Sequence, residues 1–204
     1  ANEHDLPLVP RGGGASYTDG YVPAEENSIL VDTSRMNAIV EINERDMYVV
    51  AQVGVTWAAL NDALAAKGLR TPFFGPFSGI AATIGGGLSQ GAVTWGTGVF
   101  GISGENVLGV EVVLGTGEVV RTGSWGAANS VPFLRLYGPD LTGLFMSDAG
   151  ALGIKTTVSM RLMPRREHVL GLSFGFKDFD SMAAGMEAAA REGVNLTNFG
   201  LDPA

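Results

Sequence analysis

The order of apolar and polar positions predicts short strands first and then a helix. Four short apolar runs, typical of strands, lie at residues 6–9, 29–31, 38–42 and 47–53. Thr56 then stands where a helix N-cap is expected, and Gly68 stands where a helix commonly ends. Between them, Trp57, Leu60 and Leu64 recur on one helical face, so we expect these three side chains in the core.

The middle of the chain has a different pattern. Residues 69–104 are rich in Gly, Pro, Phe and Thr and show little periodicity. A loop region of this length inside a compact domain is usually functional. Beyond it, apolar runs at 107–114 and 118–121 flank a glycine-rich turn and predict a hairpin. We expect a short helix at 140–147 and a strand at 151–163.

The composition changes near Arg165, where we expect a domain boundary. Residues 169–176 have the pattern of a strand, and residues 180–191 that of an alanine-rich helix. We therefore expect one domain over residues 1–165 and the start of a second over 166–204. The mixture of strands and helices predicts an α+β fold.

Two glycine-rich segments are the strongest functional signal. The first apolar run leads into Pro10-Arg-Gly-Gly-Gly-Ala-Ser-Tyr-Thr-Asp-Gly20. Successive glycines allow a backbone that points several N–H groups at one anion. A second block, Thr83-Ile-Gly-Gly-Gly-Leu-Ser89, follows Gly75-Pro-Phe-Ser-Gly79. Each block alone is also compatible with a mobile surface turn, but two in one domain predict a long ligand with phosphates in its middle.

Composition excludes several classes of chemistry. The 204 residues contain no cysteine, which excludes disulfides, thiolate catalysis and cysteine-ligated metal centres in this chain. The net charge of −8 argues against a nucleic-acid surface. No apolar stretch is long enough to span a bilayer and no signal peptide is visible, so we expect a cytoplasmic location. His4 and His168 lack ligand spacing, so we expect no metal site.

Two other motifs suggest rival functions. Gly87-Leu-Ser-Gln-Gly91 matches the nucleophile elbow of serine hydrolases, with Ser89 as nucleophile, and His168 is the one histidine that follows it. Gly96-Thr-Gly-Val-Phe-Gly101 matches the dinucleotide fingerprint, but the residues after it are poor helix formers. Both motifs require a preceding strand and a following helix, and we therefore rank both below a phosphate-binding role for the glycine loops.

Four segments in order resemble the FAD-binding domain of vanillyl-alcohol-oxidase-like (FAD-linked oxidase) flavoproteins. The resemblance is nearest to the D-lactate, glycolate and D-2-hydroxyglutarate dehydrogenase group. Two of these segments are the glycine loops at Pro10 and Thr83, and the third runs from Val107 to Glu118. The fourth is Asp140-Leu-Thr-Gly-Leu-Phe145 with its continuation to Arg165. The resemblance implies two subdomains that clasp FAD, followed by the start of a substrate-binding cap domain. It also leads us to expect that the family's first strand–helix segment and most of the cap are missing.

The resemblance also implies which residues meet the cofactor. The expected FAD-binding residues are Arg11, Gly12, Gly13, Gly14, Ala15, Ser16, Gly20, Pro76, Ser78, Thr83, Ile84, Gly85, Gly86, Gly150, Gly153 and Ile154. Some family members attach the flavin to a histidine of the first loop. Residues 10–20 contain none, so we expect noncovalent FAD. Ala149 and Ala151 stand where relatives often carry glutamate and threonine, and the side-chain contacts from those positions are lost.

The implied activity is oxidation of a 2-hydroxy acid or a related alcohol by hydride transfer to FAD. In such relatives the catalytic groups come largely from the cap domain, so we name no catalytic residue and no electron acceptor. Three alternatives stay open: a flavoprotein of this fold that acts on a sugar or aromatic alcohol, a serine hydrolase using Ser89, and a nucleotide-binding module without turnover. A homodimer also stays open.

Overall fold

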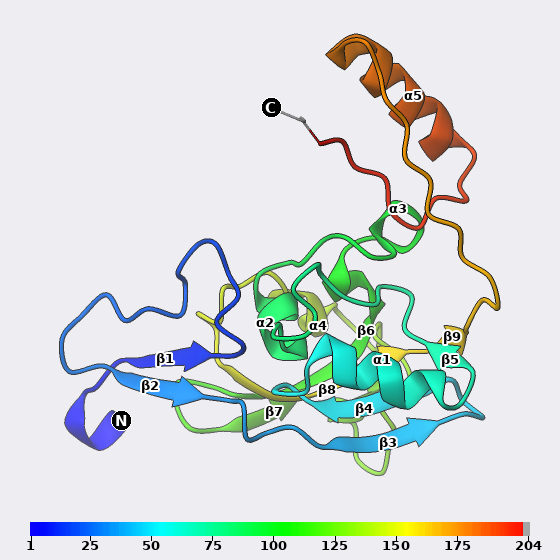
Figure 1. The fold of residues 1–204 in the computed structure, drawn as a ribbon. Helices are drawn as coiled ribbons and strands as arrows, with labels where there is room; N and C mark the ends of the chain where they lie inside the picture. The colour runs from blue at the N-terminus through cyan, green and yellow to red at the C-terminus, as the bar shows by residue number, and fades with distance from the viewer. Residues whose placement is uncertain (202–204) are drawn as a thin grey trace.

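The computed structural model describes residues 1–201 and contains three small sheets (Figure 1). A five-stranded antiparallel sheet has the order β3 (Ile39–Asn43), β4 (Tyr48–Gln52), β8 (Ile154–Arg161), β6 (Val107–Val113) and β7 (Val119–Arg121). A parallel pair joins β1 (Leu8–Arg11) to β2 (Ile29–Asp32), and an antiparallel pair joins β5 (Leu69–Arg70) to β9 (Met163–Pro164).

The helices are mostly short. The α-helices are α1 (Trp57–Ala65), α2 (Ile84–Ser89), α3 (Thr97–Phe100), α4 (Leu141–Leu144) and α5 (Phe179–Arg191), and single 3-10 turns are η1 (Asn2–His4), η2 (Ser103–Asn106) and η3 (Gly123–Gly126). None of the helices in residues 1–201 is long and apolar enough to cross a membrane. The mixture of elements confirms the expected α+β class.

The main core lies between the five-stranded sheet and helices α1 and α2, which lie on one side of it in Figure 1. Val49 and Ala51 of β4 and Val158 and Met160 of β8 face this core and are at most 1% exposed. Their two-residue spacing is that of one face of a strand. The central pair β4 and β8 therefore carries helices α1 and α2.

Helix α1 forms as its sequence predicts. The Thr56 side chain accepts a hydrogen bond from the Ala59 N–H at 3.2 Å, and Gly68 takes the left-handed φ of 67° just beyond the helix. Trp57, Leu60 and Leu64 are each at most 1% exposed and face the sheet.

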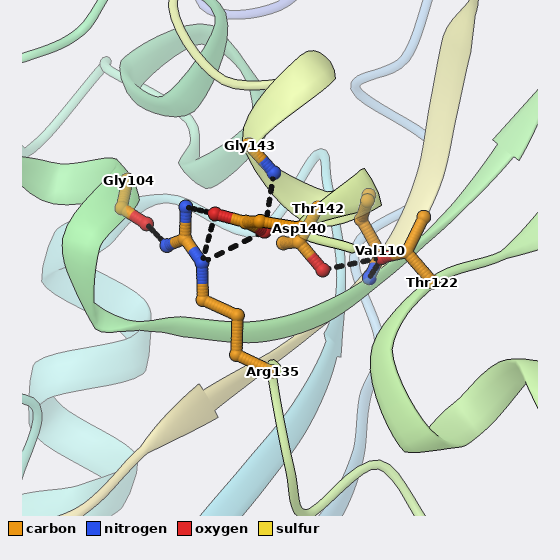
Figure 2. A network of polar contacts seen from close by, with 7 residues as sticks. All are labelled: Gly104, Val110, Thr122, Arg135, Asp140, Thr142 and Gly143. Carbon is orange, nitrogen blue, oxygen red and sulfur yellow. Dashed lines mark hydrogen bonds and ion pairs between the residues drawn. The ribbon is translucent and has the colours of Figure 1, made fainter. Parts of the chain in front are cut away.

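A charged cluster fixes the segment that precedes β8 (Figure 2). The Arg135 guanidinium donates to the Asp140 carboxylate, with a shortest distance of 2.9 Å, and to the Gly104 carbonyl at 2.6 Å. Asp140 also accepts from the Gly143 N–H at 2.9 Å and so caps α4. The hydrogen bond from Arg135, followed by those from the α4 backbone, lowers the pKa of Asp140 despite some desolvation.

Two buried threonines extend this cluster to the sheet. The Thr142 and Thr122 hydroxyls lie 2.7 Å apart, and the Val110 N–H of β6 donates to the Thr122 hydroxyl at 3.0 Å (Figure 2). These side-chain hydrogen bonds therefore link α4 to the sheet. They fix the position from which the chain enters the turn at 147–150.

The predicted strand at 169–176 is wrong. These residues are extended and exposed, and no strand among residues 1–201 pairs with them. A strand needs a partner for its N–H and C=O groups, so an alternating pattern alone does not make one. The helix predicted at 180–191 is confirmed as α5, which Asp178 caps through the Ser181 N–H at 2.8 Å.

Leu60→Ala tests the packing of α1 on the sheet. Because Leu60 is fully buried, we expect the free energy of unfolding to fall by about 2–5 kcal/mol in a denaturant titration. Val40→Ala is the control, since Val40 is 61% exposed on β3. A change below about 0.5 kcal/mol for Leu60→Ala would contradict the assigned core.

Candidate functional site

A cavity of about 530 Å³ lies between the first glycine loop, α2 and the start of β8. Most of the residues predicted to bind the cofactor line it: Arg11, Gly12, Gly13, Gly14, Ala15, Ser16, Gly20, Pro76, Ser78, Thr83, Gly85, Gly86, Gly150 and Gly153. Segments far apart in the sequence are thus brought to one cavity, whose volume is typical of a small-molecule site.

Ile84 and Ile154 do not line the cavity. Ile84 is fully buried in the main core, because the first turn of α2 directs it toward the sheet. Ile154 lies between Gly153 and Lys155, which both line the cavity, and alternation along an extended strand places it on the other face. The structure therefore does not support a side-chain role for these two in the cavity.

The first glycine loop packs directly against residues 81–83. A Cβ on Gly12 would lie 2.3 Å from the Thr83 hydroxyl oxygen, and one on Gly13 would lie 1.9 Å from the Ala81 carbonyl oxygen. Neither distance is compatible with a side chain. Gly14 has a left-handed φ of 65°, so its role is conformational, whereas Gly12 and Gly13 are required for close approach.

The same loop presents free backbone donors. The N–H groups of residues 12–16 donate to no acceptor within residues 1–201, and the next bonded N–H is that of Thr18, which donates to the Ser16 hydroxyl at 3.2 Å. Residues 12–16 line the cavity, and consecutive N–H groups without an internal acceptor are able to bind an anion.

The second glycine block has another role. The Ile84 and Gly85 N–H groups donate to the carbonyls of Val55 and Val53, both at 2.8 Å, and the Gly86 N–H donates to the Thr83 cap at 3.2 Å. These donors are used inside the protein. The second block therefore forms a close wall of the cavity and contributes shape, while the first block offers hydrogen-bond donors.

The charged side chains that line the cavity, within the described chain, are Arg11 and Lys155. Arg11 is partly exposed and pairs with Asp32 at 3.0 Å. Both residues are cations in a chain of net charge −8. Each cation is paired with a carboxylate that does not itself line the cavity, so the charged groups that face the cavity are hydrogen-bond donors.

Sequence analysis missed the environment of Lys155. Its ammonium donates to the Asp148 carboxylate at 2.6 Å and to the Ser89 hydroxyl at 3.0 Å, and the side chains of Lys155 and Asp148 are 3% exposed. The buried Asp148 carboxylate also accepts from the Gly150 N–H at 3.0 Å, which fixes the turn before β8. The available signal was a lysine near the start of a predicted strand whose next charged residue is Arg161.

Neither rival motif has the structure it requires. Ser89 is the last residue of α2, whereas a nucleophile elbow follows a strand, and its hydroxyl accepts from Lys155. Gly96-Thr-Gly-Val-Phe-Gly101 spans the single-turn α3 and follows no strand. Within residues 1–201, no group of three or more His, Asp or Glu side chains could hold a metal ion.

Comparison with known proteins agrees with this geometry. Residues 1–123 match the family model described as FAD binding domain. The chain belongs to this family of FAD-binding domains.

Several curated relatives are similar over most of the chain. It is 34% identical to the glycolate oxidase subunit GlcD of Bacillus subtilis, over 89% of this chain and 37% of that protein. It is 31% identical to D-2-hydroxyglutarate dehydrogenase of Stutzerimonas stutzeri, over 98% of this chain and 41% of that protein. For the cytochrome-linked D-lactate dehydrogenase 1 of Saccharomyces cerevisiae the identity is 31%, over 96% and 32% respectively. The chain thus spans well under half the length of these relatives.

A solved structure supports the fold. A structure of alkyldihydroxyacetonephosphate synthase superposes on 80% of this chain and 28% of its own length, with a TM-score of 0.66 and 21% identity. The expected fold of the FAD-linked oxidase type is confirmed.

Gly13→Ala tests the close approach of the two loops. The added Cβ would meet the Ala81 carbonyl, so we expect the free energy of unfolding to fall by about 1–3 kcal/mol. Gly115→Ala is the matched control, because a Cβ there meets nothing within 4 Å. Chemical denaturation measures both variants. Equal stability of the two would show that the loops do not pack as described.

Proposed function

We propose that the cavity binds FAD noncovalently, with its pyrophosphate on the N–H groups of residues 12–16. The observation that carries this proposal is the row of unbonded donors on a loop that lines the cavity. Gly12 and Gly13 bring this loop against the second glycine block, and Thr83 and Gly86 border the same space. The residues fit a pyrophosphate, since the loop supplies donors and no carboxylate of the described chain lines the cavity.

The proposed whole protein is an oxidoreductase that oxidises a 2-hydroxy acid. Bound FAD would supply the hydride acceptor, while the residues of this chain bind and orient it. The relatives named above are glycolate, D-lactate and D-2-hydroxyglutarate enzymes, which supports this substrate class. A flavoprotein of this fold that acts on a sugar or aromatic alcohol is the alternative.

The proton acceptor for this reaction is proposed to lie outside the cavity lining described here. Hydroxyl oxidation needs a general base. Within residues 1–201 the lining contains no histidine, aspartate or glutamate, which are the side chains whose ordinary pKa leaves them able to accept a proton near neutral pH. We also propose that a second, substrate-binding domain begins after residue 165. The extended segment there exposes the alternate apolar side chains Leu170, Leu172, Phe174 and Phe176.

A flavin titration tests cofactor binding. We expect FAD to bind this chain saturably and at least about tenfold more tightly than riboflavin, because riboflavin lacks the phosphates that charge-assisted hydrogen bonds would hold. Flavin fluorescence and visible absorption measure both affinities, and urea-unfolded chain is the control. Equal affinities, or no FAD binding, would contradict the pyrophosphate site.

Anaerobic reduction tests the substrate class. In the protein that contains this chain, loaded with FAD, we expect D-lactate, glycolate or D-2-hydroxyglutarate to bleach the visible band of the flavin. Glucose and benzyl alcohol serve as comparison donors. Bleaching by the comparison donors alone would favour the alternative substrate class. Bound flavin that no donor reduces would favour a module without turnover.

A further inference from the structure

Lys155, the buried cation in the cavity wall, has no role in the proposed function. Lys155 is the second residue of β8, and its side chain is 3% exposed while the residue lines the cavity. It is far less accessible than Arg11, the other cation of the lining, whose side chain is 36% exposed. A charge in such a place is screened little by water, so its neighbours in the protein decide what it can bind.

Two partners fix the ammonium group from the protein side. The Asp148 carboxylate lies 2.6 Å from Lys155 Nζ, and the Ser89 hydroxyl lies 3.0 Å from it. Asp148 does not itself line the cavity, whereas Ser89 does. An ammonium carries three N–H donors. Two are used by these partners, and the third has no acceptor within residues 1–201.

The charge state of Lys155 depends on its partner. Burial lowers the pKa of Lys155, while the hydrogen bond and charge of Asp148 oppose that shift. Oδ2 of Asp148 is buried and has no hydrogen-bond partner in the described chain. A well-packed apolar pair is often at least as stable as a buried ion pair. Stability alone therefore gives no reason for this pair at a cavity wall.

The turn at Asp148–Gly150 also contacts β1, the strand that leads into the first glycine loop. A Cβ on Gly150 would lie 2.7 Å from Cγ of Pro10, so the Asp148–Gly150 turn packs on the end of β1. The Ala149 N–H also donates to the Ser89 carbonyl at 2.8 Å, which joins the turn to α2. Lys155 and the free N–H groups of residues 12–16 therefore belong to connected walls of one cavity.

We propose that Lys155 is a cofactor-binding residue that donates its third N–H to an anionic phosphate oxygen of FAD. Asp148 and Ser89 are positioning residues that hold the ammonium and do not contact the cofactor phosphate. This inference rests on the proposed function, because it assigns a further contact in the same site. It gives the pyrophosphate a buried ammonium donor in addition to the backbone donors of the first glycine loop.

The test separates cofactor binding from a purely structural ion pair. Lys155→Met alone leaves a buried carboxylate without its partner, so that variant is expected to be unstable. The double variant Asp148→Asn with Lys155→Met removes both charges and keeps similar volumes. We expect it to regain most of the stability lost in Lys155→Met and yet to bind FAD about tenfold more weakly than the wild type. Denaturation and FAD titration measure the two quantities.

The control is an exposed ion pair far from the site. Lys67 contacts Glu44 on the surface, and the double variant Glu44→Gln with Lys67→Met changes the charges in the same way. We expect it to keep wild-type FAD affinity. If the double variant does not fold, Lys155→Gln serves as a second probe. This variant keeps a donor for Asp148 but loses the charge, and we expect the same loss of FAD affinity.

The outcomes for the proposed function and for this inference are distinct. If the wild type does not bind FAD, the proposed function fails and the inference fails with it. If the wild type binds FAD and a folded variant without the Lys155 charge binds it equally well, the proposed function stands. In that case Lys155 and Asp148 only join β8 to the turn before it, and the inference is overturned.

Discussion

The structure of the candidate site depends on backbone packed against backbone with no side chain between. At Gly12 and Gly13 a single added carbon would collide with Thr83 and with the Ala81 carbonyl. Close approach of the two loops is what places the unbonded N–H groups of residues 12–16 on the cavity wall. The glycines of the first loop thus allow close packing as well as flexibility. This packing positions the unbonded N–H groups of residues 12–16.

The remainder of the fold holds the second wall in place. Strand β8 lies at the centre of the five-stranded sheet, and the end of β8 that borders the cavity pairs with β6 through Ile154 and Lys155. Pairing with β4 begins two residues further on, at Thr157. The chain reaches β8 through α4, which Asp140 caps and Arg135 and Thr142 tie to neighbouring segments (Figure 2). A rigid sheet centre and a cross-linked approach can hold a buried lysine at one position. A mobile loop could not hold it in this way.

Patterns of residues close in sequence predicted much of the fold, but they could not predict contacts between distant segments. The cap at Thr56, the helical spacing from Trp57 to Leu64 and the hairpin of β6 and β7 depend on residues close in sequence, and all were predicted. The strand expected at 169–176 failed because pairing depends on another segment. For the site, fourteen of the sixteen residues predicted to bind the cofactor line the cavity, and they are fewer than half of its lining. The Lys155 contact with Ser89 joins residues 66 positions apart, and no local pattern encodes it.

Amide hydrogen exchange with and without FAD tests the central claim most directly. The claim is that the N–H groups of residues 12–16 hold the cofactor, so these amides should exchange more slowly when FAD is bound. Amides of the turn at 115–117, where the glycines meet no neighbour within 4 Å, should not change. Saturable FAD binding that leaves exchange at residues 12–16 unaltered and protects other segments would contradict the account.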